Sequence, residues 1–295
     1  MHRGEPMETT SLESNLADGQ GTTSDERRSA RHRRRFDREV AALDLARGPF
    51  SEAPVTEEDL VALPTAAQRY LHFMKVVGRP RDWSFRAGWR GHFRRGPNEA
   101  WLPCEAWQYD SAVEVARIFY MRLTLANLIP TVVRDTYLKG HGRMQAKAYD
   151  LFKVVDATGL ELDIGEMVTY LNDAVLYAPS MILCPHTEWL AVGESCFDLK
   201  LHDGPHTVSA RIFIDGRGAP YDFSTTDRFV SDPYTKDHPL VRARWTTPVD
   251  DWVQWDSRVV PRQGKAVWHL PEGTFDYARF HLLRGGLAFN VAPGA

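Results

Sequence analysis

The 295-residue sequence contains few cysteines, and their positions favour neither a metal site nor a disulfide framework. Cys104, Cys184 and Cys196 are widely spaced and form no Cys-x-x-Cys pair. An odd number of separated cysteines is typical of neither a zinc knuckle nor a disulfide-stapled domain. We expect three small apolar residues of the protein core, in a protein of the reducing cytoplasm.

Long hydrophobic runs are missing as well. No stretch approaches the roughly 20 apolar residues that a membrane-spanning helix needs. The first 25 residues lack the hydrophobic segment of a secretory signal. The sequence therefore predicts a soluble, cytoplasmic protein without a transmembrane segment.

Familiar catalytic and cofactor motifs are also lacking. There is no Gly-x-Ser-x-Gly elbow, no Gly-rich phosphate loop ending in Lys-Ser or Lys-Thr, and no dinucleotide fingerprint. His202 and His206 bracket a turn, and Cys184 lies near His186, but neither pair reaches three metal ligands. The net charge of −3 gives no general attraction to nucleic acid. We expect no cofactor, no metal ion and no specific nucleic-acid partner.

Positive charge is concentrated near the N-terminus. Residues 1–25 are rich in Gly, Ser, Thr and acidic residues, so we expect them to be disordered. The next segment carries a cluster of arginines: Arg27, Arg28, Arg31, Arg33, Arg34, Arg35 and Arg38. Such a cluster is typical of a solvated helix start, and RNA, an acidic partner or a membrane surface are alternative uses. We predict a disordered arm with an Arg-rich helix over 1–48, for which an acidic partner stays open.

Aromatic residues and two-residue alternation dominate the rest of the chain. The aromatic share is 11%, which favours half-buried strands over helical bundles. From Trp83 onward, apolar and polar residues alternate, as in Trp89, Arg90, Gly91 and His92. Further strands are predicted within 101–110, 115–125, 131–140, 187–229, 265–270 and 277–291. Asp-Gly dipeptides at 203–204 and 215–216 indicate hairpin turns.

Helical signals flank and interrupt these strands. Residues 56–59 resemble a capping box, and Pro64 starts a helix that continues to Val77. A central helix over 165–179 ends at Pro179. Because strands continue on both sides of this helix, we predict a single β-rich domain over 49–295. Its fold class is α+β and mainly antiparallel, a curved sheet or half-barrel with helices packed on it.

Several short segments, taken in order, resemble a known family. They are LPTAAQRYL (63–71), Gln108 after a Trp-rich strand, DTYLKGHGRM (135–144), GLELDIGEMVTYLNDA (159–174), FIDGRG (213–218) and AVWHLPEGTFDYARF (266–280). Across 60–290 the chain resembles a bacterial family defined by the domain of unknown function numbered 6544. The resemblance brings no assigned activity. Relatives tend to have Arg in place of Thr169 and Glu in place of Asp173, so a polar site shared with them stays open.

The arrangement of strands around one inserted helix also resembles the half-barrels of bacterial lipoprotein carriers. This is an analogy of fold and implies no function.

The central helix carries the most informative polar pattern. Glu166, Tyr170, Asp173 and Tyr177 are spaced by four, three and four residues, so they share one helix face. This face either turns into a pocket or lies in water as in an ordinary amphipathic helix. In a partly dry pocket, carboxyl groups beside phenols would have raised pKa values, which suit proton transfer.

A second candidate lies on residues 135–143. Asp135, Tyr137 and Lys139 share a strand face, and the flanking glycines Gly140 and Gly142 indicate a bulge or the close approach of another backbone. His141 is a candidate acid or base near neutral pH, or simply a residue that caps the bend. Gln108, Glu105 and Arg228 either meet the central helix across the barrel mouth or pair across the sheet surface.

The sequence leaves three functions open. The first is binding of a small hydrophobic molecule in an aromatic-lined half-barrel cavity. Its expected ligand-binding residues are Trp89, Trp107, Gln108, Phe119, Tyr137, Tyr177, Arg228 and Trp268. The alternative is a cofactor-independent acid/base enzyme (a cyclase, isomerase or hydrolase) acting on an apolar molecule, with Glu166, Asp173, Tyr170 and His141 as catalytic residues. The third is a scaffold whose Arg-rich arm docks an acidic partner.

Overall fold

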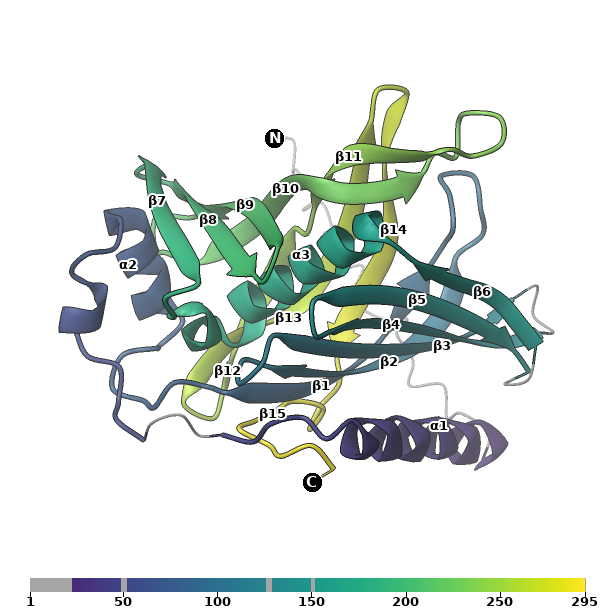
Figure 1. Cartoon of the computed structure of the whole chain (residues 1–295), viewed down its shortest axis with the longest axis horizontal. Coiled ribbons are helices and arrows are strands. Elements are labelled where there is room, and N and C mark those ends of the chain that lie inside the picture. Colours follow the sequence, from purple (N-terminus) through teal and green to yellow (C-terminus); the bar gives the residue numbers. More distant parts are fainter. Residues whose placement is uncertain (1–22, 49–51, 126–128, 150–151, 295) are drawn as a thin grey trace, which may run out of the picture.

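A computed structural model describes residues 23–48, 52–125, 129–149 and 152–294 (Figure 1). The segment expected to be disordered therefore lies almost entirely outside the described residues. The first six strands are β1 (Ser84–Phe93), β2 (Leu102–Ser111), β3 (Ala116–Leu125), β4 (Ile129–Leu138), β5 (His141–Ala148) and β6 (Phe152–Thr158). The later strands are β7 (Thr187–Gly193), β8 (Cys196–Asp203), β9 (His206–Ile214), β10 (Pro220–Ser231), β11 (Leu240–Thr246), β12 (Val249–Trp255), β13 (Arg258–Leu270), β14 (Gly273–Leu282) and β15 (Ala288–Phe289).

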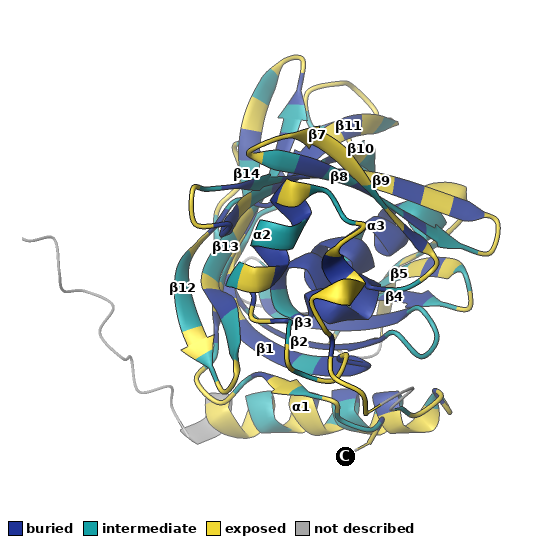
Figure 2. Cartoon of the chain, turned by 90° about the vertical axis from the view of Figure 1, so that its left-hand side faces the viewer, coloured by how far each residue is buried: buried dark blue, intermediate teal, exposed yellow. Residues whose placement is uncertain are grey.

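The strands form one antiparallel sheet in the order β6-β5-β4-β3-β2-β1-β14-β13-β11-β10-β9-β8-β7, with β12 on β13 and β15 on β1. Register shifts interrupt the pairing of β5 with β6, β7 with β8, β10 with β11 and β13 with β14. Such bulges bend the strand that carries them and increase its twist. The sheet is therefore curved and open, as Figures 1 and 2 show, and the predicted fold class is confirmed.

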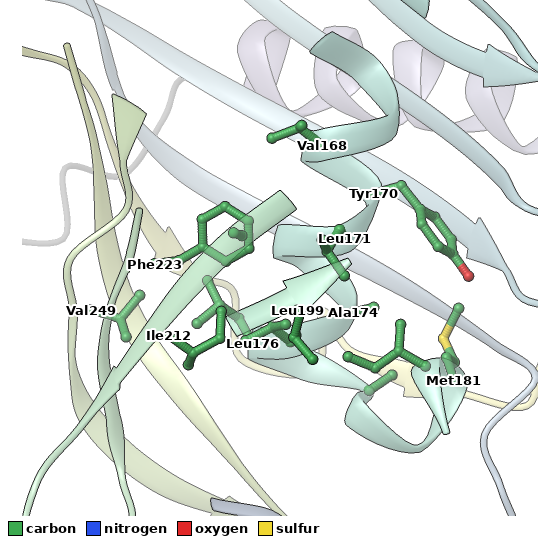
Figure 3. Packing of buried hydrophobic residues seen from close by; sticks show 14 of the residues in the cluster. Val168, Tyr170, Leu171, Ala174, Leu176, Met181, Leu199, Ile212, Phe223 and Val249 are labelled. Atoms are coloured by element: carbon green, nitrogen blue, oxygen red, sulfur yellow. The ribbon is translucent and has the colours of Figure 1, made fainter. Parts of the chain in front are cut away.

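Helix α3 (Leu160–Tyr177) lies on the concave face of this sheet. It follows β6 and precedes β7, which are the two ends of the strand order, so it crosses from one half of the sheet to the other. Val168, Leu171 and Val175 are fully buried. Figure 3 shows Leu171 and Ala174 beside Leu199 of β8 and Ile212 of β9. The helix begins five residues before the predicted start and ends at Tyr177, ahead of the 3-10 helix η2 (Pro179–Ile182).

The N-terminal helical signals produce shorter elements than expected. Asp59 accepts hydrogen bonds from the backbone and hydroxyl of Thr56, at 2.8 and 3.1 Å, as in the predicted cap, but only the 3-10 turn η1 (Glu58–Leu60) follows. Helix α2 (Thr65–Phe73) ends before Val77, because Lys75 adopts a positive φ of 55°. The hydroxyl of Tyr70 donates to the carbonyl oxygen of Val175 at 2.7 Å and so joins α2 to α3.

The Arg-rich segment forms helix α1 (Thr23–Ala42), which packs on the convex face of the sheet. Phe36 and Val40 are buried there, and the ring of Phe36 meets that of Tyr120 edge-on at 5.8 Å. The opposite side of the helix presents an exposed row of arginines spaced by four, three and four residues: Arg27, Arg31, Arg34 and Arg38. The division of the chain at residue 48 and the acidic partner for this helix stay predictions.

Candidate functional site

A cavity of about 170 Å³ lies between α3 and the concave face of the sheet. Its apolar wall comes from several strands and from the helix: Trp89, Phe93, Phe119, Met121, Leu176, Tyr177, Trp245, Val249, Ala266, Tyr277, Ala278 and Phe280. Engineered apolar cavities of roughly 150 Å³ hold benzene. The cavity therefore has room for a molecule about the size of a single ring.

Polar side chains enter this cavity because the strand register aligns them on one face. Gln108 on β2 pairs with Phe119 on β3, which in turn pairs with Asp135 on β4. One row further, Asp110 on β2 pairs with Arg117 on β3. Directly paired residues of antiparallel strands project from the same side of the sheet. All of these side chains therefore face α3.

Arg117 joins the sheet to the helix through two buried ion pairs. Its Nε donates to Oδ2 of Asp173 at 2.8 Å, and its Nη1 donates to Oε2 of Glu166 at 3.0 Å. Burial disfavours the guanidinium charge, but the neighbouring carboxylates outweigh it and raise the pKa of Arg117. The polar stripe of α3 is thus turned inward. It is not solvated, since Glu166 and Asp173 expose only 5% and 9% of their surface.

Two amide side chains donate the other hydrogen bonds that Asp173 accepts. Gln108 donates from Nε2 to Oδ2 of Asp173 at 2.7 Å and to Oδ1 of Asp110 at 2.9 Å. Asn172 donates to Oδ1 of Asp173 at 3.1 Å and accepts a hydrogen bond from the hydroxyl of Thr247. Complete burial, and then the charge of Asp173, raise the pKa of Asp110. Burial therefore disfavours the charged form of Asp110.

Asp135 is a titratable residue of the cavity with an unpaired carboxyl oxygen. Its Oδ1 is inaccessible to solvent and has no hydrogen-bond partner among the described residues. Burial, together with the nearby carboxylate of Glu166, raises the pKa of Asp135 to about 7. This carboxyl group can therefore change its protonation state near neutral pH, inside the cavity.

Arg228 on β10 supplies the second guanidinium of the cavity. Its Nη1 donates to the hydroxyl of Thr169 on α3, and its Cζ lies 4.5 Å from the ring centre of Trp245. Its Nε is buried without a partner, and no carboxylate of the described chain forms an ion pair with it. Gln108, Arg117, Asp135, Glu166, Asp173 and Arg228 are called the polar cluster below.

The structure brings together seven of the twelve residues that were expected to bind the ligand or to act as catalytic residues. Those that line the cavity are Trp89, Gln108, Phe119, Glu166, Asp173, Tyr177 and Arg228. The indole nitrogen of Trp89 donates to the hydroxyl of Tyr177 at 3.2 Å, which fixes both rings in the wall. Their roles in binding or catalysis stay predictions.

Three other selected residues are buried but do not line the cavity. Trp107 lies on the convex face under α1, because it precedes Gln108 by one residue on the same strand. Tyr137 donates to Asp203 at 2.7 Å, beyond the cavity wall. Trp268 stacks on Tyr277, with ring centres 5.9 Å apart, and so supports a lining residue from behind.

The remaining two selected residues are placed away from the cavity. Tyr170 is buried on a side of α3 that Figure 3 shows turned away from Val249, a lining residue. His141 is exposed at the β4–β5 turn, with Nδ1 3.8 Å from Asp163.

One of the two glycines beside His141 permits the close approach of another backbone, which the sequence had indicated as one possible role of these glycines. A Cβ on Gly142 would lie 2.1 Å from the carbonyl oxygen of Leu162. The backbone nitrogen of Gly142 donates to Asp163 at 2.7 Å. Gly142 therefore allows the start of α3 to rest directly on β5.

Sequence reasoning missed Arg117, the centre of the polar cluster, and gave no site role to Asn172, Trp245 or Tyr277. Arg117, Phe119 and Met121 occupy one face of a strand by alternation. An arginine on the otherwise apolar face that carries Phe119 was the available signal.

No group of three or more metal-ligating side chains comes together among the described residues. Within the same residues, no helix combines the length and apolar character required to cross a lipid bilayer.

Fold and site together define an open antiparallel half-barrel in which a helix covers a small cavity with aromatic walls and a polar cluster. The chain belongs to a family of unknown function, DUF6544, whose sequence profile matches residues 53–280. The family recognised from the sequence segments is thereby confirmed. No curated protein matches the chain.

Solved structures of similar topology have very different sequences. A putative outer membrane lipoprotein-sorting protein domain from Vibrio parahaemolyticus has a TM-score of 0.37 at 7% identity, over 70% of this chain and 85% of that one. A LolA superfamily protein from Nitrosomonas europaea has 0.35 at 11%, over 77% and 94%. A DUF1329 family protein from Desulfovibrio piger has 0.40 at 11%, over 77% and 92%. At these TM-scores the likenesses carry no information about what this chain binds.

Proposed function

We propose that this protein binds a small, largely apolar molecule in the cavity between α3 and the sheet. The observation that carries the proposal is the wall itself, which combines Trp89, Phe119, Trp245 and Phe280 around an interior of about 170 Å³. Small-molecule sites are concave and mostly apolar, with a few polar groups that fix orientation. The polar cluster supplies such groups. A cytoplasmic location, expected from the sequence, belongs to the same proposal.

The direct test uses toluene as a ring-sized apolar probe, with binding measured by titration calorimetry. The purified protein should bind toluene, and Ala278→Leu should reduce this binding at least tenfold, because Ala278 is a buried wall residue. Ala191→Leu on the exposed edge strand β7 is the matched control and should bind as the parent does. Absence of toluene binding, together with no small molecule in a solvent extract of the purified protein, would refute the proposal.

A second candidate function is acid/base catalysis on the bound molecule. The observation that favours it is the carboxyl group of Asp135, whose pKa is raised to about 7 at the cavity surface. Glu166 and Asp173 are less suitable bases than the sequence suggested, because both carboxylates are engaged by Arg117. If catalysis occurs, Asp135→Asn should abolish turnover and leave binding within a fewfold of the parent, whereas unchanged turnover would exclude Asp135 as the base.

A further inference from the structure

The polar cluster contains two buried atoms that its own side chains leave without partners. Oδ1 of Asp135 is a hydrogen-bond acceptor, and Nε of Arg228 is a donor. Both residues line the same cavity. Buried polar atoms without partners are uncommon in folded proteins, because each costs free energy comparable to a lost hydrogen bond.

The other buried charged groups of the cavity are engaged with one another. Arg117 is shared between Glu166 and Asp173, and Gln108 and Asn172 occupy the remaining positions around Asp173. A ligand therefore gains little from these groups. The open positions are those of Asp135 and Arg228.

We infer that the bound molecule is an apolar compound carrying a hydroxyl group, which donates a hydrogen bond to the carboxylate of Asp135 and accepts one from the guanidinium of Arg228. This inference rests on the proposed function and adds the chemical class of the ligand. A hydroxyl group matches both side chains in kind, since it is a donor and an acceptor at once. The aromatic wall receives the rest of the molecule.

A carboxylate head group fits the same position less well. It would pair with Arg228, but it cannot donate a hydrogen bond, and it would add negative charge beside Asp135 and Glu166. A pure hydrocarbon would leave both atoms unsatisfied. The chemistry of the cavity thus ranks a hydroxyl compound above a hydrocarbon and a carboxylate.

The test compares three probes of nearly equal size on the full chain at pH 8: phenol, toluene and benzoate. A wholly apolar cavity binds toluene much more tightly than phenol, because the buried hydroxyl group is left unpaired. Here phenol should bind at least as tightly as toluene, and benzoate at least tenfold more weakly than phenol. A tenfold preference for toluene would overturn the inference and leave the proposed function intact. Benzoate as the tightest ligand would also overturn it, in favour of an acid head group.

Substitutions of Asp135 and Arg228 test whether these two side chains bind the hydroxyl group. Asp135→Leu and Arg228→Met should each weaken phenol binding at least tenfold, with toluene binding unchanged or stronger. Asp135→Asn retains an acceptor oxygen and should keep most of the phenol affinity. Arg211→Met is the control, because Arg211 is an exposed residue of β9 that pairs with Asp198. An unchanged ratio of phenol to toluene affinity in Asp135→Leu would refute the inference. Failure of all three probes would refute the proposed function as well.

Discussion

Arg117 on β3 and Asp173 on α3 form a buried ion pair with an Nε–Oδ2 distance of 2.8 Å. Through this contact the side chain at the start of one strand holds the helix that covers the cavity. Gln108 and Asn172 also donate to Asp173, so this carboxylate accepts hydrogen bonds from three side chains. A buried ion pair of this kind costs little when complete and much when one partner is removed.

The first prediction follows from that asymmetry. Arg117→Met leaves Glu166 and Asp173 buried without a cation, so the free energy of unfolding should fall by about 3–5 kcal/mol. Urea unfolding measures the change. Arg211→Met, on an exposed pair, should cost less than about 1 kcal/mol. If the triple variant that adds Glu166→Gln and Asp173→Asn recovers no stability, the loss does not arise from the unpaired carboxylates.

The second prediction concerns pH. The pKa of Asp135 is about 7 in the folded protein, against 3.8 for an ordinary aspartate. The folded state therefore keeps a proton that the unfolded state releases between about pH 4 and 7, and stability falls as pH rises through this interval. Asp135→Asn should remove that loss and be more stable than the parent at pH 8, by at most roughly 4 kcal/mol. At pH 4 the two proteins should be nearly equal.

Asp156 is the control, because its pKa is shifted in the opposite direction to that of Asp135. Hydrogen bonds from Arg143 and Lys153 lower the pKa of this exposed carboxyl group, so its contribution is present at neutral pH and lost in acid. Asp156→Asn should therefore differ from the parent at pH 8 and converge with it at low pH. Unfolding curves between pH 4 and 8.5 that show no separation between the parent and Asp135→Asn would contradict a raised pKa at Asp135.

The third prediction compares two glycines near the start of α3. Gly142→Ala places a Cβ about 2.1 Å from the carbonyl oxygen of Leu162, so the helix must shift, at a cost of about 1–3 kcal/mol. Gly165→Ala meets no atom within 4 Å and lies inside α3, where alanine should add about 0.5–1 kcal/mol of stability. Thermal unfolding of both variants should give shifts of opposite sign. Equal shifts would mean that contact with β5 does not position the helix.

The fourth prediction concerns α1. Phe36 is 1% exposed between α1 and the sheet, and its ring is the main apolar contact of the helix with Tyr120. Phe36→Ala should weaken the docking of α1 by about 3–5 kcal/mol. Hydrogen exchange should then accelerate over 23–42 while the strands β1 to β4 remain protected. Arg34→Ala, on the exposed side, should leave exchange unchanged.

The strand series and the central helix could be predicted from the sequence because their side-chain periods differ. Alternation identified β1 to β4, and the Asp-Gly dipeptides marked the turns at both ends of β9. Strands β5, β6, β11 and β12 were not recognised. β6 ends the strand order and pairs on one side only, so its side chains are mostly exposed.

The candidate site was predicted in part, for reasons that lie in geometry. Glu166, Asp173 and Tyr177 share a helix face that reaches the cavity, but the sequence pattern could not say which way this face would turn. Trp107 and Gln108 were both expected to bind the ligand, although neighbours on a strand point to opposite faces. The pairing of Asp110 with Arg117 depends on strand register, which the individual segments do not reveal.

The attachment of α3 at both ends has a consequence for how a ligand enters and leaves. One residue, Gly159, separates the helix from β6, and the compact η2 turn connects it toward β7. The helix therefore cannot swing out on a single hinge without dragging an edge strand with it. Passage is easier between side chains, beside the half-buried rings of Phe93 and Phe280. A ligand should accordingly enter and leave without the movement of a backbone lid.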